Sequence, residues 1–363
     1  YYLSFIVIIS MSNKTKIYRY AMAPMVDVTD YAFRQIVSLK SNSSFMTWTE
    51  FVSVDGLIAN PNKFKRQMAY HSIQRPIVCQ LFGHDAKKFK EAARIVRDQG
   101  FDAIDINMGC PVRKVVERQS AGSALILDPM AAGDIIKATK DGVDNALPVF
   151  VKTRIGFDHI DIDRWIPILL QTEPQLLTLH LRTKKELSNC PAHWEDDVVG
   201  RTLRQRGDST TTRIFGNGDL ESMEQCRDKL NTYNQLDGIM VGRGTYGNPW
   251  FFSDVNGNQS SLKDKLTAMV EHAILIEQQN ALYSGQSIKS IGVHIRNYCQ
   301  PLSQYGDVAA LRTHLIQATT SKDIANILNQ YLISKRLPDH LLDDHQTIKD
   351  SLYEQVDKLD ISF

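Results

Sequence analysis

A cysteine on a sharp turn is the residue of this 363-residue chain best suited to chemistry. Cys110 stands on a Gly-Cys-Pro turn just past the apolar run 103–108. Because proline cannot continue a paired strand, the turn is expected to project the thiol from the strand's carboxyl end. A thiol with an ordinary pKa of about 8.5 is mostly protonated at neutral pH and can donate a proton, whereas a thiol of lowered pKa would attack as a nucleophile. Both roles are favoured over that of a small buried hydrophobe, the interpretation given to Cys79 and Cys226.

Three polar side chains on further apolar runs suit a flavin. Lys152 and His180 stand near the ends of two such runs, and Gln80 lies within a third. A cation near N1 and the C2 carbonyl of the flavin ring stabilises its anionic reduced form, and an amide can bond to the pyrimidine edge. A lone histidine is more often a satisfied core residue, so His180 is informative only beside Lys152.

Two glycine-rich turns follow the last two apolar runs before residue 250. They are Asn217-Gly218-Asp219 and Gly242-Arg243-Gly244. Backbone N–H groups in such turns bind phosphate in many barrels, and the arginine adds positive charge. The simpler interpretation, that the glycines only end strands, is less satisfactory because both turns occur together.

Basic side chains are concentrated in segments 112–122 and 182–185. Such runs usually do no more than solvate a surface, but two of them beside one site suit a polyanionic substrate. The candidate substrate-binding residues are Asn107, Arg113, Lys114, Arg154, Arg182 and Lys184.

The elements that must position these residues alternate short apolar runs with amphipathic stretches such as 85–98 and 130–143. This rhythm indicates repeated βα units and a parallel sheet, and eight units fit an α/β fold of the (β/α)8 TIM-barrel type. The alternative, a doubly wound sheet, would need a G-x-G-x-x-G after the first strand, and the chain has none there. The eight runs are 17–25, 45–48, 76–82, 103–108, 148–154, 176–181, 214–217 and 238–242.

The composition changes after the eighth unit. A polar linker, 253–261, leads into strand-poor sequence with helical periodicity at 262–280, 288–304, 308–318 and 324–334. We therefore expect an N-terminal extension at 1–16, a barrel at 17–252 and a C-terminal helical domain at 262–363. Residues 1–10 precede Met11 and are expected to be upstream sequence, with the native protein beginning at Met11.

Composition and charge narrow the class of protein. With 43% hydrophobic and 23% charged residues the chain has an ordinary globular composition, and its formal net charge of +1 gives no global attraction for nucleic acid. The five cysteines show no C-x-x-C pair and no zinc-ligand spacing, so no disulfide or structural zinc is expected. The apolar run 1–10 is shorter than the roughly 18 residues that span a bilayer. A cytoplasmic monomer that binds neither metal nor membrane is expected.

Several segments together resemble the tRNA-dihydrouridine synthases, flavin enzymes that reduce the C5=C6 bond of uridines in tRNA. The N-M-G-C-P-x-x-K-V pattern is the most specific, and the resemblance extends from about 20 to 252. The matching segments are 23–30, 80–83, 105–115, 121–125, 151–156, 180–194, 217–219, 242–244 and 247–250.

The resemblance implies FMN as the cofactor, NADPH as the electron donor, tRNA as the partner and a tRNA-binding role for the helical tail. It also implies that Cys110 is the general acid, delivering a proton to C5 of an extruded uridine while hydride reaches C6. The residues that it implies for FMN binding are Pro24, Met25, Val26, Gln80, Lys152, His180, Asn217, Gly218, Asp219, Gly242 and Arg243.

The chain departs from the family pattern at four positions. Asp27, Leu181 and Cys190 stand where the family has glycine, and His193 replaces an aspartate. These departures leave the phosphate turns and Cys110 unchanged, but they put in question the flavin edge and the substrate channel after the sixth strand.

Two other functions compete with tRNA reduction. A small-molecule FMN enzyme of the dihydroorotate or dihydropyrimidine type shares the phosphate turns, but it needs neither a helical tail nor basic loops. An RNA-binding protein without catalysis is opposed by the presence of Cys110, Lys152 and Arg243.

Overall fold

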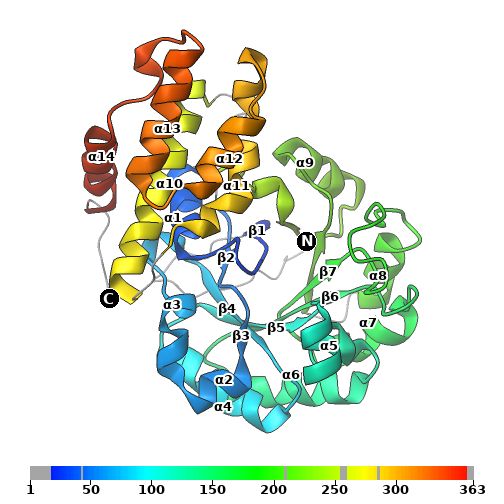
Figure 1. The fold of residues 1–363 in the computed structure, drawn as a ribbon. Coiled ribbons are helices and arrows are strands. Elements are labelled where there is room, and N and C mark those ends of the chain that lie inside the picture. The colour runs from blue at the N-terminus through cyan, green and yellow to red at the C-terminus, as the bar shows by residue number, and fades with distance from the viewer. Residues whose placement is uncertain (1–17, 42–43, 208–210, 254–259, 284–286, 358–363) are drawn as a thin grey trace, which may run out of the picture. The chain divides into compact units, whose positions relative to one another are not determined.

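The computed structural model describes residues 18–41, 44–207, 211–253, 260–283 and 287–357 (Figure 1). The chain divides into two compact units. The expected extension 1–16, with its start at Met11, and most of the expected linker 253–261 lie outside the described residues. The first unit takes in Tyr1–Pro24, Ser44–Phe64 and Pro76–Gly242, and the second takes in Met25–Ser43, Lys65–Arg75 and Arg243–Phe363.

The first unit is a barrel of parallel strands in the order β1-β9-β8-β7-β6-β5-β4-β2 (Figure 1). Backbone bonds close it, because the N–H of Met22 donates to the Met46 carbonyl at 2.9 Å and the N–H of Met46 donates to Tyr20 at 2.9 Å. The predicted (β/α)8 barrel is confirmed. Its strands are β1 (Tyr20–Met22), β2 (Thr47–Trp48), β3 (Val52–Ser53), β4 (Ile77–Phe82), β5 (Ala103–Met108), β6 (Val149–Arg154), β7 (Leu176–His180), β8 (Arg213–Asn217) and β9 (Gly238–Val241).

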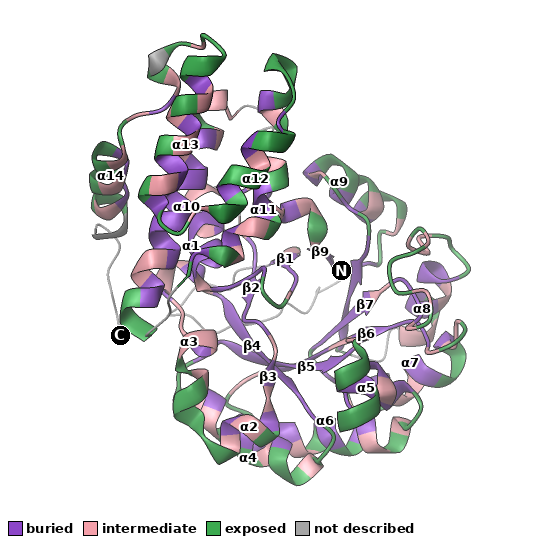
Figure 2. Ribbon diagram, in the orientation of Figure 1, coloured by how far each residue is buried: buried purple, intermediate pink, exposed green. Residues whose placement is uncertain are grey.

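The strands follow the apolar runs of the sequence. Each of the eight predicted runs contains a strand, and the strands of the barrel are almost entirely buried (Figure 2). Parallel strands that are covered on both faces are expected to be continuously apolar. The additional strand, β3, shares a barrel position with β2: Thr47 lies opposite Ile77 of β4, and Val52 lies opposite Leu81.

The helices of the barrel begin at side-chain caps. The Asp85 carboxylate accepts the N–H groups of Lys87 and Lys88 at the start of α4, and Asp128 caps α6, whose first residue is Pro129. The helices predicted at 85–98 and 130–143 are thereby confirmed. The helices of this unit are α2 (Val54–Ala59), η1 (Pro61–Phe64), α4 (Ala86–Asp98), α5 (Arg113–Gln119), η3 (Gly122–Ile126), α6 (Pro129–Val143), α7 (Ile162–Gln171), α8 (Val199–Arg206) and α9 (Met223–Thr232).

The second unit is helical and draws on three separate parts of the chain. Residues 25–43 and 65–75, which the sequence pattern places with the barrel, group here with the C-terminal helices. Helix α14 was not among the helices predicted from the sequence. The helices of this unit are α1 (Tyr31–Lys40), α3 (Lys65–Met68), η2 (Ser72–Gln74), η4 (Arg243–Thr245), α10 (Leu262–Tyr283), η5 (Lys289–Ile291), α11 (Gly292–Tyr298), η6 (Gln300–Tyr305), α12 (Ala309–Gln317), α13 (Ser321–Ser334), η7 (Asp339–Leu341) and α14 (His345–Asp357).

A buried histidine joins the parts of the second unit. The N–H of Gly247 donates to Nδ1 of His294 at 3.1 Å, and Nε2 of His294 donates to the Val28 carbonyl at 3.3 Å. The ring stacks on Phe33 of α1 with the centroids 4.0 Å apart. Burial, with a contribution from His272, lowers the pKa of His294 to about 3, so the ring is neutral and can accept one bond and donate the other.

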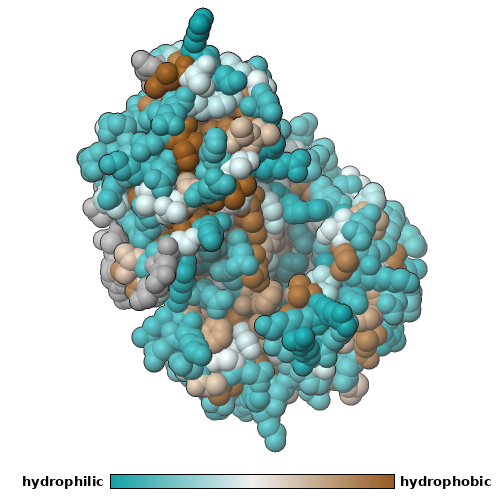
Figure 3. Space-filling view, in the orientation of Figure 1, coloured by the Kyte–Doolittle hydropathy of each residue, from teal (hydrophilic) through white to brown (hydrophobic). Residues whose placement is uncertain are grey.

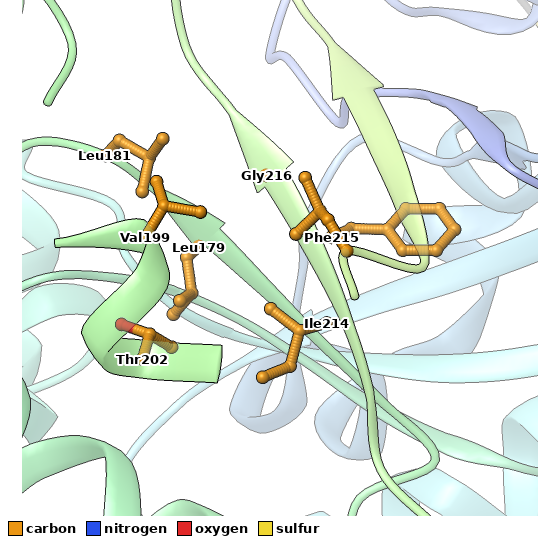
Figure 4. A pocket seen from close by; sticks show the side chains of 8 residues that line it. Leu179, Leu181, Val199, Thr202, Ile214, Phe215 and Gly216 are labelled. Atoms are coloured by element: carbon orange, nitrogen blue, oxygen red, sulfur yellow. The ribbon is translucent and has the colours of Figure 1, made fainter. Parts of the chain in front are cut away.

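The face of the molecule seen in Figure 3 is mostly hydrophilic. None of the described helices is long and apolar enough to cross a membrane. A small apolar gap lies between β7, β8 and α8 (Figure 4). Leu181, at a position where the related pattern has glycine, is 2% exposed and lines this gap. The gap therefore belongs to the packing between strands and helix. Its lining residues are Leu179, Leu181, Val199, Thr202, Ile214, Phe215, Gly216 and Leu236.

We predict opposite effects for one substitution at two glycines of α6. A Cβ at Gly142 would lie 2.4 Å from the backbone oxygen of Lys90 and 2.8 Å from Cβ of Ala93, so Gly142→Ala forces α4 and α6 apart. Overpacking of this kind costs about 1–3 kcal/mol of unfolding free energy. A Cβ at Gly133 would meet only Thr172, at an ordinary 3.6 Å, so Gly133→Ala is expected to gain about 0.5–1 kcal/mol from helix propensity.

Urea unfolding of the two variants and the parent chain measures both changes. A Gly142→Ala variant as stable as Gly133→Ala would contradict the close packing of α4 on α6.

Candidate active site at the carboxyl ends of the strands

A chain of polar side chains connects β4 and β5. Nε2 of Gln80 donates to the Asp105 carboxylate at 2.7 Å, and Nδ2 of Asn107 donates to Oε1 of Gln80 at 3.0 Å. All three side chains are at least 90% buried. Each amide is oriented by its neighbour, because a carboxylate accepts only and an amide presents one donor side and one acceptor side.

The far end of this chain holds the turn that carries Cys110. Oδ1 of Asn107 accepts the N–H of Gly109 at 3.1 Å and the N–H of Cys110 at 2.9 Å. The Cys110 carbonyl accepts the N–H of Ser123 at 3.0 Å. Close approach on that side needs a glycine, since Gly122 has φ +59° and a Cβ there would lie 2.8 Å from the Cys110 oxygen. Hydrogen bonds therefore hold the backbone of Cys110 at both its N–H and its carbonyl.

The thiol itself stands in partly apolar surroundings. Cys110 packs against a cluster of Phe82, Val115 and Ala121, and Phe51 meets Phe82 edge-on with the centroids 4.7 Å apart. Burial raises the pKa of the Cys110 thiol above its ordinary value, despite the opposing effect of nearby cations. The group therefore keeps its proton at neutral pH, which suits a proton donor and not a thiolate nucleophile.

Lys152 of β6 lies across from this turn and is partly buried. Its Nζ donates to Oδ1 of Asn217 at 3.2 Å, and Nδ2 of Asn217 donates to the Met240 carbonyl at 2.8 Å. Burial and the Arg154 guanidinium lower the pKa of Lys152 to about 8, against the opposite effect of Asp105. An electron-rich ligand edge placed beside Lys152 would stabilise its charged form.

Asp105 of β5 is a buried acidic residue that interacts electrostatically with Lys152 of β6. Burial raises the pKa of Asp105 to about 7, although Gln80 and Lys152 favour its charged form. The sequence pattern includes this residue in a motif but assigns it no role. The signal available was an acidic side chain in the middle of an apolar strand, where burial without a partner is costly.

Arg154, at the end of β6, donates to three backbone carbonyls. Its Nε bonds to Gly109 at 2.8 Å, and its Nη1 bonds to Thr183 at 2.9 Å and Leu187 at 3.0 Å. We expected this residue to bind substrate. The structure instead places its guanidinium between the Cys110 turn and the loop after β7.

Arg182, only 2% exposed, is used in the same way. Its Nη2 pairs with Asp219, its Nε donates to the Cys190 carbonyl at 2.7 Å, and its Nη1 lies 3.2 Å from Nε2 of His180. Asp219 also accepts the N–H of Ala192 at 2.8 Å. Arg182 therefore joins the predicted His180 and Asp219 into one cluster beside β7 and β8.

The glycines after β8 make room for this loop. A Cβ at Gly216 would lie 2.5 Å from the Trp194 ring, and one at Gly218 would lie 2.6 Å from Cβ of Ala192. Nε1 of Trp194 donates to the Gly218 carbonyl at 2.8 Å. Packing of the loop thus requires both glycines, a role that the sequence did not reveal.

The remaining predicted residues are distributed over several elements of the two units. Arg113 is exposed and pairs with Glu117 at 2.6 Å, Lys114 is exposed, and Lys184 lies over the Phe157 ring at 4.7 Å. Pro24 and Gly242 belong to the first unit, whereas Met25, Val26 and Arg243 belong to the second. The cited bonds place eight of the predicted residues in three groups: Gln80, Asn107 and Cys110; Lys152 and Asn217; and His180, Arg182 and Asp219.

The chain is similar in sequence to known proteins. A "probable tRNA-dihydrouridine synthase" of Staphylococcus epidermidis is 36% identical over 263 residues, which cover 71% of this chain and 78% of the relative. The "probable tRNA-dihydrouridine synthase 2" of Bacillus subtilis is 30% identical over 315 residues, 86% and 93% of the two chains. A solved structure of histamine dehydrogenase from Rhizobium sp. 4-9 is similar with a TM-score of 0.47 and 12% identity, covering 71% of this chain and 49% of that one.

A model of the dihydrouridine synthase (Dus) family matches residues 21–335, most of the chain. The resemblance found in the sequence is thereby confirmed, and with it an oxidoreductase function for which the family implies a flavin. The chain belongs to the dihydrouridine synthase family.

Proposed function

We propose that this protein reduces the C5=C6 bond of uridines in tRNA, with FMN as the bound flavin and NADPH as the electron donor. The observation that carries the proposal is the geometry of the Cys110 turn, which Asn107 holds, together with burial that raises the pKa of the Cys110 thiol and lowers that of the nearby Lys152 to about 8. Family membership and the names of the relatives support tRNA as the substrate. A cytoplasmic location follows from that substrate.

The residues of the barrel fit a flavin. Lys152 has a lowered pKa that an electron-rich ring edge would raise again, and Asn217 holds its ammonium group in place. Nε2 of Gln80 has a second hydrogen beyond the one that it gives to Asp105. We assign Lys152 and Gln80 to the pyrimidine side of FMN, and His180 to the same site.

Each side chain has a defined task in the proposed reaction. FMN, when bound, supplies the hydride that C6 of the uracil receives. Cys110 holds a proton and delivers it to C5, and Asn107 with Gly122 keeps the thiol at one position while it does so. Phe51 and Phe82 exclude water from one side of the thiol, which keeps its pKa high. The uridine must leave its stack to reach this site.

We assign tRNA binding to the helical second unit and to the basic loops of the barrel. Residues 262–363 carry 10 Lys+Arg against 12 Asp+Glu, so this region has no net positive charge. Binding there must depend on a few placed cations and on the shape of a folded RNA. The exposed Arg113 and Lys114 are the barrel residues best placed to contact phosphate, because Arg154 bonds to backbone carbonyls and Arg182 bonds to Asp219 and the Cys190 carbonyl.

Replacement of Cys110 tests the proposed function. Cys110→Ala removes the proton donor, so reoxidation of the reduced flavin by unmodified tRNA should slow by about 10²–10⁴. Reduction of the flavin by NADPH does not use that proton and should keep its wild-type rate. Rapid-mixing absorbance measures the two half-reactions separately, and dihydrouridine in the digested tRNA identifies the product. Reoxidation within about threefold of the wild-type rate would exclude Cys110 as the donor.

The pH dependence of FMN affinity tests the assignment of Lys152. Lys152 is charged in the free protein below about pH 8 and loses its proton above it. Bound flavin favours the charged form and raises the pKa, so binding above pH 8 takes up a proton and the dissociation constant should rise by up to about tenfold per pH unit. Fluorescence titration of FMN into flavin-free protein measures it. Lys152→Met should bind FMN more weakly at pH 7 and lack the rise above pH 8.

Lys185→Met, which removes an exposed lysine of the barrel, is the matched control and should retain the full pH dependence. If the dissociation constant of FMN for Lys152→Met still rises above pH 8, a residue other than Lys152 supplies the cation next to the flavin.

A further inference from the structure

Three side chains of different chemical type meet in the loop between β7 and α8. They are Glu186, Cys190 and His193, and their carboxylate oxygen, sulfur and ring nitrogen all lie within 4.8 Å of one another. All three are partly buried. The cysteine spacing of the chain gave no sign of this cluster, because only one cysteine takes part in it.

The arrangement is close to that of a tetrahedral zinc site. Zinc–ligand distances of about 2.0–2.3 Å place the ligand atoms of such a site roughly 3.3–3.8 Å apart. Oε1 of Glu186 already lies 2.9 Å from Nε2 of His193. Zinc between these two atoms would replace one hydrogen bond, and closing the site around Cys190 would take a shift of about 1 Å.

Each member of the cluster is held through an atom that the metal would not use. Nδ1 of His193 lies 2.7 Å from Oε1 of Glu195, the carboxylate–histidine pair that orients a ligating imidazole. Oε2 of Glu186 accepts the N–H of Thr183 at 2.7 Å. The Cys190 carbonyl accepts Nε of Arg182 at 2.7 Å, which fixes the backbone from which the thiol projects.

The donor set decides which cation would bind. One sulfur, one imidazole nitrogen and one carboxylate oxygen suit Zn²⁺, whereas Mg²⁺ and Ca²⁺ prefer oxygen alone. The carboxylates of Glu186 and Glu195 add negative charge on two sides of His193. We propose that Glu186, Cys190 and His193 bind one Zn²⁺, with the fourth position open to water.

Binding deprotonates the Cys190 thiol and frees Nε2 of His193, and the released protons pass to solvent. The site is a property of this chain and not of its family pattern, since Cys190 and His193 are two of the positions at which the chain departs from that pattern. It is also independent of the proposed reduction of tRNA, because no reacting group takes part in it.

Zinc bound here would stabilise the folded conformation of the loop between β7 and α8. The same segment is attached to the end of β8 by Trp194 on Gly218 and by Ala192 on Asp219. A cation bound by Glu186, Cys190 and His193 would cross-link this loop segment internally. We therefore expect zinc to raise the unfolding temperature as well as to bind.

Zinc content tests the proposal on the untagged, flavin-loaded protein. After dialysis against a chelator, then against ZnCl2 and buffer, mass spectrometry of the metal should find one zinc per chain. Cys190→Ser and His193→Asn should each lose it. Cys110→Ser is the matched control, because Cys110 and Cys190 are the two cysteines of the five that are not buried, and it should retain the metal. Flavin content and circular dichroism establish that each variant is folded.

Isothermal titration with ZnCl2 adds a graded readout. Glu195→Gln alters only the residue that orients His193, so it should weaken zinc binding by about 10- to 100-fold without abolishing it. The proposal is wrong if the parent chain retains no zinc, if folded Cys190→Ser retains it, or if zinc is lost from Cys110→Ser. In those cases Glu186, His193 and Glu195 form an ion-pair network only.

Discussion

The side-chain oxygen of Asn107 is the acceptor on which the candidate active site depends. It accepts hydrogen bonds from two consecutive donors of a partly buried turn, the backbone N–H groups of Gly109 and Cys110. An unpaired buried donor costs about 1–3 kcal/mol, so this contact strongly favours one conformation of the turn. The orientation of the Asn107 amide is in turn set by Gln80, whose Nε2 donates to an oxygen of the Asp105 carboxyl group. The sequence of donors and acceptors therefore runs from the buried Asp105 carboxyl group to the backbone N–H of Cys110.

The second unit is organised by a bond pattern of the same kind, centred on His294. The ring accepts from Gly247 and donates to Val28, and both bonds require the neutral imidazole. Because burial lowers its pKa to about 3, the ring keeps that state over the whole range in which a protein works. One side chain of α11 thus ties together the segment after β9 and the segment before α1, which are more than 200 residues apart in sequence.

Local sequence was sufficient for the strands and for the residues that end them. The apolar runs predicted every barrel position. The Gly-Cys-Pro turn and the lone lysine of β6 are the signals that make Cys110 and Lys152 candidates. The assignment of the arginines was not accessible in this way. A basic residue after a strand has the same sequence signature whether it faces a substrate or bonds to carbonyls, and only the folding of distant loops around Arg154 and Arg182 decides between the two. The grouping of α1 with C-terminal helices is likewise set by contacts remote in sequence.

Arg154 has a mechanical consequence beyond its hydrogen bonds. Its guanidinium is rigid and planar, and it holds Gly109 on one side and Thr183 and Leu187 on the other. The loop after β7 is therefore coupled to the Cys110 turn, because its displacement either breaks charge-assisted bonds or moves Gly109, the neighbour of Cys110. A ligand that displaced this loop would therefore also displace the Cys110 turn, because Arg154 bonds to both.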